Sequence, residues 1–308
     1  MRIVSLIASA TEIVCALGAQ ADMVGRSHEC DFPHDILILP HLTAAKFHGA
    51  QTSLAIDNAV KALVANGLSV YEVDANQLEA LKPDVIVTQD QCEVCAVSLA
   101  DVEAAVCQWT GRAAKVLSLR PHTLVDVLED VGRVGAAIGR QAEAAALVSE
   151  MQTRLRKIAQ AVANRARPRV AFIEWIEPLM SCGHWVPELT EIAGGSSCFG
   201  KTGETSPWIS HADLTAADPD VIIIAPCGYD NAASVAEYGV LSIRPDWQGL
   251  RAVRDGRVFI ADGNAFFNRP GPRIVETAEI LASILHGVPA FAAHAGANYI
   301  SVGSRKLA

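Results

Sequence analysis

Two cysteines, Cys92 and Cys95, form a Cys-x-x-Cys pair shortly after the apolar run Asp84–Val87. A structural zinc site usually pairs two such motifs, and this sequence has one. A redox dithiol sits at the start of a helix, where the helix dipole lowers a thiol pKa, and a helical pattern does begin at Ser98. We favour a role in a ligand-binding loop. Structural thiols or a disulfide, and a redox or zinc site, remain alternatives.

Other reactive, polar and aromatic side chains also follow apolar runs. In open parallel α/β sheets, ligands bind beyond the carboxyl ends of the strands, so these loops are candidate ligand contacts. We expect them to enclose a cleft that suits a sizeable, partly apolar ligand. The residues expected to line it are His28, Cys30, Cys92, Cys95, His184, Trp185, Cys227, Tyr229, Phe266 and Phe267.

Each candidate also has a purely structural interpretation. His28 and His184 could hydrogen-bond a loop backbone, and Arg269 is either an anion clamp or the partner of a carboxylate. Among the tryptophans we favour Trp185 as a ligand contact, while Trp208 and Trp247 are more typical of packing inside a lobe.

The elements that would position these loops occur twice. Leu78–Cys92 and Leu214–Gly228 each read as a short helix, a Pro-Asp turn, a β-branched apolar run and a Cys-bearing loop. Arg2–Ala19 likewise matches Arg169–Gly195, and a third pair of strand and helix closes each half. Continuous apolar strands are typical of parallel sheets covered on both faces. The sequence therefore predicts an α/β protein made of two Rossmann-like lobes with parallel sheets.

A single helix should join the lobes. From Gln141 to Ala166 there is no Gly or Pro, and apolar residues recur every three or four positions before Pro168 ends the pattern. We expect an N-terminal lobe over 1–138, a connecting helix over 139–167 and a C-terminal lobe over 168–288. The small, polar residues 289–308 predict a tail that lies on the surface or is disordered.

Composition narrows the function classes. A net charge of −9 argues against non-specific nucleic-acid binding, and no apolar run is long enough to span a bilayer. No Walker A motif, strand-linked G-x-G-x-x-G or G-x-S-x-G elbow is present. The start of the sequence does not read as a secretory signal peptide, which predicts a cytoplasmic chain as it stands, or a periplasmic one if a leader has been removed.

The opening Arg2–Pro33, the repeated Pro-Asp strands, the segment Ser206–Leu214, the long helix and the closing Pro-Arg helix resemble the helical-backbone, class III periplasmic-binding-protein-like family. These are the substrate-binding proteins of metal-chelate ABC transporters, and the resemblance is greatest to their cobalamin-binding members. It implies a non-catalytic binder of cobalamin, haem or an iron–siderophore complex, held between the lobes and passed to an ABC permease.

The resemblance and the loop positions together give the expected ligand contacts. These are Ser9, Thr11, His28, Glu29, Cys30, Gln91, Cys92, Trp175, His184, Trp185, Tyr229, Asn264, Phe266, Phe267 and Arg269. The Cys- and His-bearing loops are unusual for the family and indicate a possible bound transition metal, because imidazole and thiolate suit cobalt, zinc or iron. The candidate metal ligands are His28, Cys30, Cys92, Cys95, His184 and Cys227. The alternative is a cytoplasmic metalloprotein or enzyme that uses the same Cys and His residues.

Overall fold

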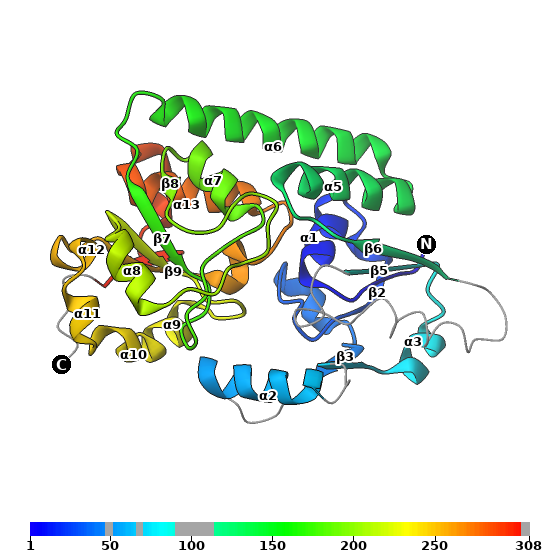
Figure 1. Ribbon diagram of the computed structural model, residues 1–308. Coiled ribbons are helices and arrows are strands. Elements are labelled where there is room, and N and C mark those ends of the chain that lie inside the picture. Colours follow the sequence, from blue (N-terminus) through cyan, green and yellow to red (C-terminus); the bar gives the residue numbers. More distant parts are fainter. Residues whose placement is uncertain (47–51, 66–69, 90–113, 303–308) are drawn as a thin grey trace. The chain divides into compact units, whose positions relative to one another are not determined.

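The computed structural model describes residues 1–46, 52–65, 70–89 and 114–302. The chain divides into two compact units (Figure 1). Unit 1 comprises 1–51, 55–121 and 125–150, and unit 2 comprises 52–54, 122–124 and 151–308. The predicted two-lobed α/β organisation is confirmed, and the short segments 52–54 and 122–124 belong to the second unit by their contacts.

Unit 1 is built around a four-stranded parallel sheet with the order β2-β1-β5-β6. The central strand β5 is buried along its whole length, as its unbroken apolar sequence predicts. A separate antiparallel pair, β3-β4, lies beside the polar loop that follows β2. The strands and α-helices are β1 (Ile3–Ser5), α1 (Ala8–Ala16), β2 (Met23–Arg26), β3 (Thr43–Ala45), α2 (Ser53–Ala65), β4 (Tyr71–Val73), α3 (Ala75–Leu81), β5 (Val85–Gln89), β6 (Lys115–Leu119) and α5 (Leu124–Ile138).

Unit 2 contains a five-stranded sheet with the order β11-β10-β9-β7-β8, parallel except for β11. Its core packs the buried Trp247 with aliphatic residues of the strands, while Phe172 on β7 meets the Phe267 ring at 6.0 Å between centroids. The strands and α-helices are β7 (Arg169–Ile173), α7 (Val186–Ile192), β8 (Ser196–Ser197), α8 (His211–Ala217), β9 (Val221–Ile224), α9 (Asn231–Glu237), α10 (Gly239–Ser242), α11 (Pro245–Gln248), α12 (Arg251–Arg254), β10 (Val258–Ala261), α13 (Ile274–His286) and β11 (Tyr299–Ser301).

The internal duplication predicted from the sequence is present in the strand order. The first unit reads β2-β1-β5-β6 and the second reads β8-β7-β9-β10, so each strand has its counterpart at the same place. The Pro-Asp turns precede β5 and β9, the two matched central strands. The carboxyl ends of corresponding strands therefore carry corresponding loops.

The long helix α6 runs from Gln141 to Val162, and it is continuous across the boundary between the units. At about 1.5 Å per residue it spans roughly 33 Å. Met151, Leu155 and Ile158 are buried, as the predicted apolar face requires. The helix ends earlier than Ala166 because its last turn tightens, with the Ala163 amide donating to Gln160 O at 3.4 Å.

The C-terminal segment differs from the expected loose tail. Tyr299–Ser301 pairs antiparallel with β10, and Val302 is buried. The hydroxyls of Tyr299 and Ser283 lie 2.9 Å apart, which fixes this edge of the sheet to α13. The polar composition is misleading here, because an edge strand is held by backbone bonds and needs little apolar alternation. Within the described residues, no helix is both long and apolar enough to cross a membrane.

Candidate functional site

Three loops of unit 2 meet at the carboxyl ends of β7, β9 and β10. The Cys227 amide donates to Glu174 O at 3.1 Å, which joins the loops after β9 and β7. The Asn264 amide donates to Tyr229 O at 3.0 Å, which joins the loops after β10 and β9. Backbone bonds thus hold residues from three distant parts of the sequence at one edge of the sheet. We call this the unit 2 edge, made up of 174–185, 204–209, 226–230 and 262–269.

Close backbone packing fixes the loop after β10. This loop forms a short π-helix, Gly263–Phe267, capped by the side chain of Asp262, which accepts from the Ala265 amide at 2.7 Å. A Cβ at Gly263 would lie 2.1 Å from Pro226 O and 2.7 Å from Ala225 C. Only glycine allows the two loops to approach so closely.

The predicted aromatic contacts differ in exposure. Trp185, Tyr229, Phe266 and Phe267 are buried, whereas Trp175 is half-buried and meets the Tyr229 ring edge-on at 5.8 Å. The indole of Trp185 donates to Phe267 O at 3.0 Å, so this side chain ties two loops together. Burial and the nearby Glu237 carboxylate raise the pKa of Tyr229. Most of these rings therefore support the loops from within.

Trp208 is more exposed than the sequence suggested. It was expected to pack inside a lobe, as Trp247 does, yet 57% of its surface is exposed. Backbone bridges place Met180 beside both Trp175 and Trp208, next to the exit of β7. We call Trp175, Met180 and Trp208 the tryptophan surface. An exposed indole at the unit 2 edge indicates a surface that could contact another molecule, because large aromatic side chains are normally covered.

A second cluster surrounds Cys182 and Glu174. Ser206 Oγ donates to the Glu174 carboxylate at 3.0 Å, and Gly183 N donates to Ser206 Oγ at 3.1 Å. Burial, together with the neighbouring Glu174 and Cys227, raises the pKa of the Cys182 thiol well above its usual value. Cys182 is therefore held protonated, which suits a structural thiol rather than a nucleophile.

His184 has an unusual backbone and a histidine neighbour. Its φ of +53° lies in the left-handed region, which is uncommon outside glycine. Its ring stacks on Trp185 with centroids 5.7 Å apart, and its Nδ1 lies 3.4 Å from Nδ1 of His122. Burial and the neighbouring His122 lower the pKa of His184.

Arg269 is buried, with 4% of its surface exposed. Its guanidinium donates to the side-chain oxygen of Asn264 at 3.0 Å. The side chains of these two predicted ligand contacts are therefore in direct contact with each other. Further along the same loop, the guanidinium carbon of Arg273 lies over the Phe266 ring, 5.2 Å from its centroid.

In unit 1 the predicted residues gather at the carboxyl ends of β1 and β2. Thr11 and Cys30 are buried, and the Thr11 hydroxyl donates to Cys30 Sγ at 3.0 Å. Ser9 is also buried, in the first turn of α1. These three side chains are buried, and their contact with a ligand stays a prediction.

His28 and Glu29 are half-buried and more accessible than their neighbours. The imidazole Nδ1 of His28 lies 2.6 Å from Thr43 Oγ1, and burial lowers its pKa, assisted by His41 and Arg26. Tyr71 donates to the Glu29 carboxylate at 3.2 Å. The antiparallel pair β3-β4 thus supports both side chains.

Gln91, Cys92 and Cys95 lie outside the described residues. Within the part of the chain that the structure describes, no disulfide is formed by Cys15, Cys30, Cys182, Cys198 or Cys227. Over the described ranges, no group of three or more His, Cys, Asp or Glu side chains is arranged to hold a metal ion.

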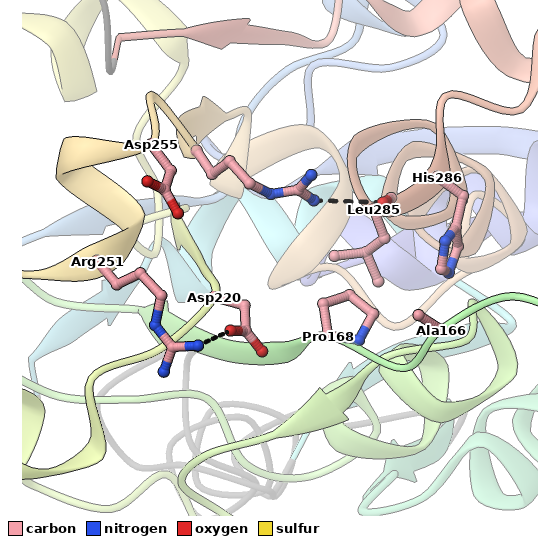
Figure 2. Close-up of a pocket in the computed structure, with 8 residues that line it drawn as sticks. Ala166, Pro168, Asp220, Arg251, Asp255, Leu285 and His286 are labelled. Atoms are coloured by element: carbon pink, nitrogen blue, oxygen red, sulfur yellow. Dashed lines mark hydrogen bonds and ion pairs between the residues drawn. The ribbon is translucent and has the colours of Figure 1, made fainter.

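A cavity of about 350 Å³ in unit 2 lies at the opposite end of the strands (Figure 2). Pro168, Asp220 and Arg257, which line it, immediately precede β7, β9 and β10. Arg251 reaches Asp220 at 2.7 Å and Arg257 donates to Leu285 O at 3.2 Å. Because ligands in parallel sheets bind at the carboxyl ends, this cavity is separate from the candidate site.

Comparisons with known proteins agree with this architecture. Residues 3–265 match the family model described as periplasmic binding protein. A cobalamin-binding protein of Halobacterium salinarum is 26% identical over 246 residues, which are 77% of this chain and 62% of that protein. The chain thus spans less than two thirds of this relative.

Solved structures show the same fold. A periplasmic heme-binding protein of Pseudomonas aeruginosa superposes with a TM-score of 0.69 at 22% identity, covering 93% of this chain and 92% of that one. The periplasmic vitamin B12-binding protein BtuF of Vibrio cholerae gives 0.64 at 19% identity, covering 94% and 97%. With a family match over most of its length and these structural likenesses, the chain belongs to the periplasmic binding protein family.

Proposed function

We propose that this protein binds a metal chelate of the cobalamin or haem class without transforming it, and that the tryptophan surface of unit 2 is part of the binding site. The observation that carries this proposal is Trp208, exposed over 57% of its surface at the carboxyl end of a parallel sheet. The indoles of Trp175 and Trp208 offer flat apolar area to a large conjugated ring. Family membership supports binding as the function.

Among chelates, we place a cobalamin first and haem second. The relative that matches by sequence is named a cobalamin-binding protein, while a heme-binding protein shares the fold at lower identity. Both ligands carry a planar macrocycle with polar groups at the rim. At the unit 2 edge, Asn264 and His184 are half-buried polar side chains that could meet such groups.

In unit 1 we propose only two side chains as ligand contacts. His28 and Glu29 are the accessible candidates there, and Gln91 and Cys92 stay predictions. The expectation that the ligand lies between the two lobes also stays a prediction.

Titration of the purified protein tests the proposal directly. Cyanocobalamin, haemin and a ferric siderophore would be added in turn, with binding followed by calorimetry and by the ligand's visible spectrum. We expect one of them to bind with a Kd in the micromolar range or tighter, about −8 kcal/mol or more. Trp208→Ala should weaken this binding about tenfold, since a central aromatic contact is worth more than about 1 kcal/mol.

Ile243→Ala is the matched control. Ile243 is also in unit 2 and is 82% exposed, but it lies at the end of α10, away from the unit 2 edge. Its removal should leave the Kd unchanged. Equal affinities for the wild type and Trp208→Ala would remove the tryptophan surface from the proposed site.

We further propose that the loaded protein delivers its ligand to an ABC-type permease, as the binding-protein family membership suggests. Cells that lack this protein should take up less labelled ligand, and re-expression should restore uptake. The expected compartment stays a prediction, and fractionation of the same cells would test it.

A further inference from the structure

His122 and His184 form a pair that the sequence pattern did not anticipate. Their Nδ1 atoms lie 3.4 Å apart, with ring centroids at 5.4 Å and the ring planes 35° apart. At 3.4 Å, any hydrogen bond between the two ring nitrogens is a long and weak one.

The separation matches metal chelation. A transition metal bonds to histidine nitrogen at about 2.0–2.1 Å. Two such bonds to nitrogens 3.4 Å apart make an angle of about 110° at the metal, close to the tetrahedral value. The distance between the two nitrogens is therefore compatible with one ion bound to both.

The backbone holds His184 in this position. The His184 amide donates to Glu204 O at 2.7 Å, and its carbonyl accepts from the Gly203 amide at 3.0 Å. A Cβ on the preceding Gly183 would lie 2.5 Å from Glu204 O, so this turn admits no larger residue there. Strained backbone conformations of this kind cluster at functional sites.

The segment that carries His122 is fixed to the same unit. The Leu124 amide donates to the Glu188 carboxylate on α7 at 3.2 Å. His184 in turn stacks on Trp185, whose indole is hydrogen-bonded to Phe267 O. The backbone next to His122 and the ring of His184 are therefore each anchored within unit 2.

We propose that His122 and His184 together bind a divalent transition metal ion through their Nδ1 atoms, with the remaining coordination positions filled by water or by a small chelating molecule. Within the described residues no third His, Cys, Asp or Glu side chain completes the group. Imidazole ligands favour zinc, nickel, cobalt or copper over magnesium and calcium. This inference does not depend on the macrocycle proposed above.

The test titrates the metal-free protein with Co²⁺, Ni²⁺ and Zn²⁺ salts, free of any chelator and affinity tag. We expect one ion per chain with a Kd below about 100 µM for at least one metal, or about −5.5 kcal/mol. The ring ¹⁵N spectra should show metal at Nδ1 of both histidines. No metal bound more tightly than about 1 mM would overturn the inference.

Substitutions assign the site. His184→Asn keeps a residue that tolerates the left-handed conformation, and His122→Gln keeps a polar side chain in its loop. Each should weaken metal binding at least tenfold, because either change removes one of the two protein ligands. His211→Gln, in the same unit but on α8, should leave binding unchanged.

The double variant Cys92→Ser and Cys95→Ser separates this site from the thiols. Metal binding should persist in it, and neither this variant nor the wild type should show a thiolate-to-cobalt charge-transfer band. Binding that survives His122→Gln and is lost in the cysteine variant would assign the metal elsewhere and refute the histidine pair. Macrocycle titration of the same variants keeps a failure here distinct from a failure of the proposed function.

Discussion

Gly263→Ala should destabilise unit 2 through one defined backbone collision. The added methyl would lie 2.1 Å from Pro226 O and 2.7 Å from both Ala225 C and Ala225 O. All three are backbone atoms, so no side-chain rotation can relieve the contact. Overpacking of this kind typically costs about 1–3 kcal/mol, and the short distances place this case near the upper end.

Two hydrogen bonds account for part of that cost. The Asn264 amide bonds Tyr229 O at 3.0 Å and the Asn268 side chain bonds Ala225 O at 3.0 Å, across the same junction. Moving the loops apart would lengthen both, at about 1 kcal/mol each. We expect a loss of about 3 kcal/mol in the free energy of unfolding, together with weaker chelate binding.

Urea unfolding followed by tryptophan fluorescence measures this loss. Of the five tryptophans, Trp175, Trp185, Trp208 and Trp247 lie in unit 2, so the signal reports mainly on the affected unit. With a slope of about 1–3 kcal/mol per molar urea, the midpoint should fall by roughly 1–3 M.

Gly239→Ala provides the control. No atom lies within 4 Å of a Cβ built at Gly239, at the start of α10. Alanine there should leave the midpoint unchanged or raise it, because alanine is the better helix former by up to about 1 kcal/mol. A Gly263→Ala midpoint equal to that of the wild type would refute the close approach of the two loops.

Two further predictions concern charged groups. Burial raises the pKa of Asp130 from 3.8 to about 6 despite its contact with Arg133. Since the folded state binds this proton more tightly, stability should rise by about 1.4 kcal/mol between pH 7.5 and pH 5, and Asp130→Asn should remove that increment in urea titrations at both pH values. Arg154 bonds Glu276 at 3.1 Å and Glu279 at 2.9 Å, so Arg154→Met should cost about 1–2 kcal/mol by leaving two carboxylates facing each other, and added salt should reduce the loss. If the stability of Asp130→Asn changed with pH as that of the wild type does, the assignment of Asp130 would be contradicted. A urea midpoint of Arg154→Met equal to that of the wild type would contradict the role of Arg154.

Periodicity and repetition were enough to predict the scaffold. The buried strands β5 and β9 have unbroken apolar sequences, and matched Pro-Asp turns reveal that they are counterparts. The apolar face of α6 was predictable for the same reason, because helix period depends only on local sequence. The edge strand β11 was not, since its pairing is made by backbone atoms that carry no sequence signal.

Site residues were harder to predict because exposure depends on tertiary contacts. Trp208 and Trp247 look alike in sequence, yet one is 57% exposed and the other 1%. His122 gave no motif, and its approach to His184 arises because the segment 122–124 folds with unit 2. The contact of the buried Cys30 thiol with Thr11 also had no sequence signal, and the role of Cys30 as a ligand contact stays a prediction.

The most direct test of chelate binding is a titration of cyanocobalamin and haemin into the purified protein. The proposed function predicts saturable binding of one ligand per chain, in the micromolar range or tighter, with a shift in the ligand's visible spectrum. No binding of either ligand, or of a ferric siderophore, at concentrations up to roughly 1 mM would leave only about 4 kcal/mol for any interaction and would contradict it.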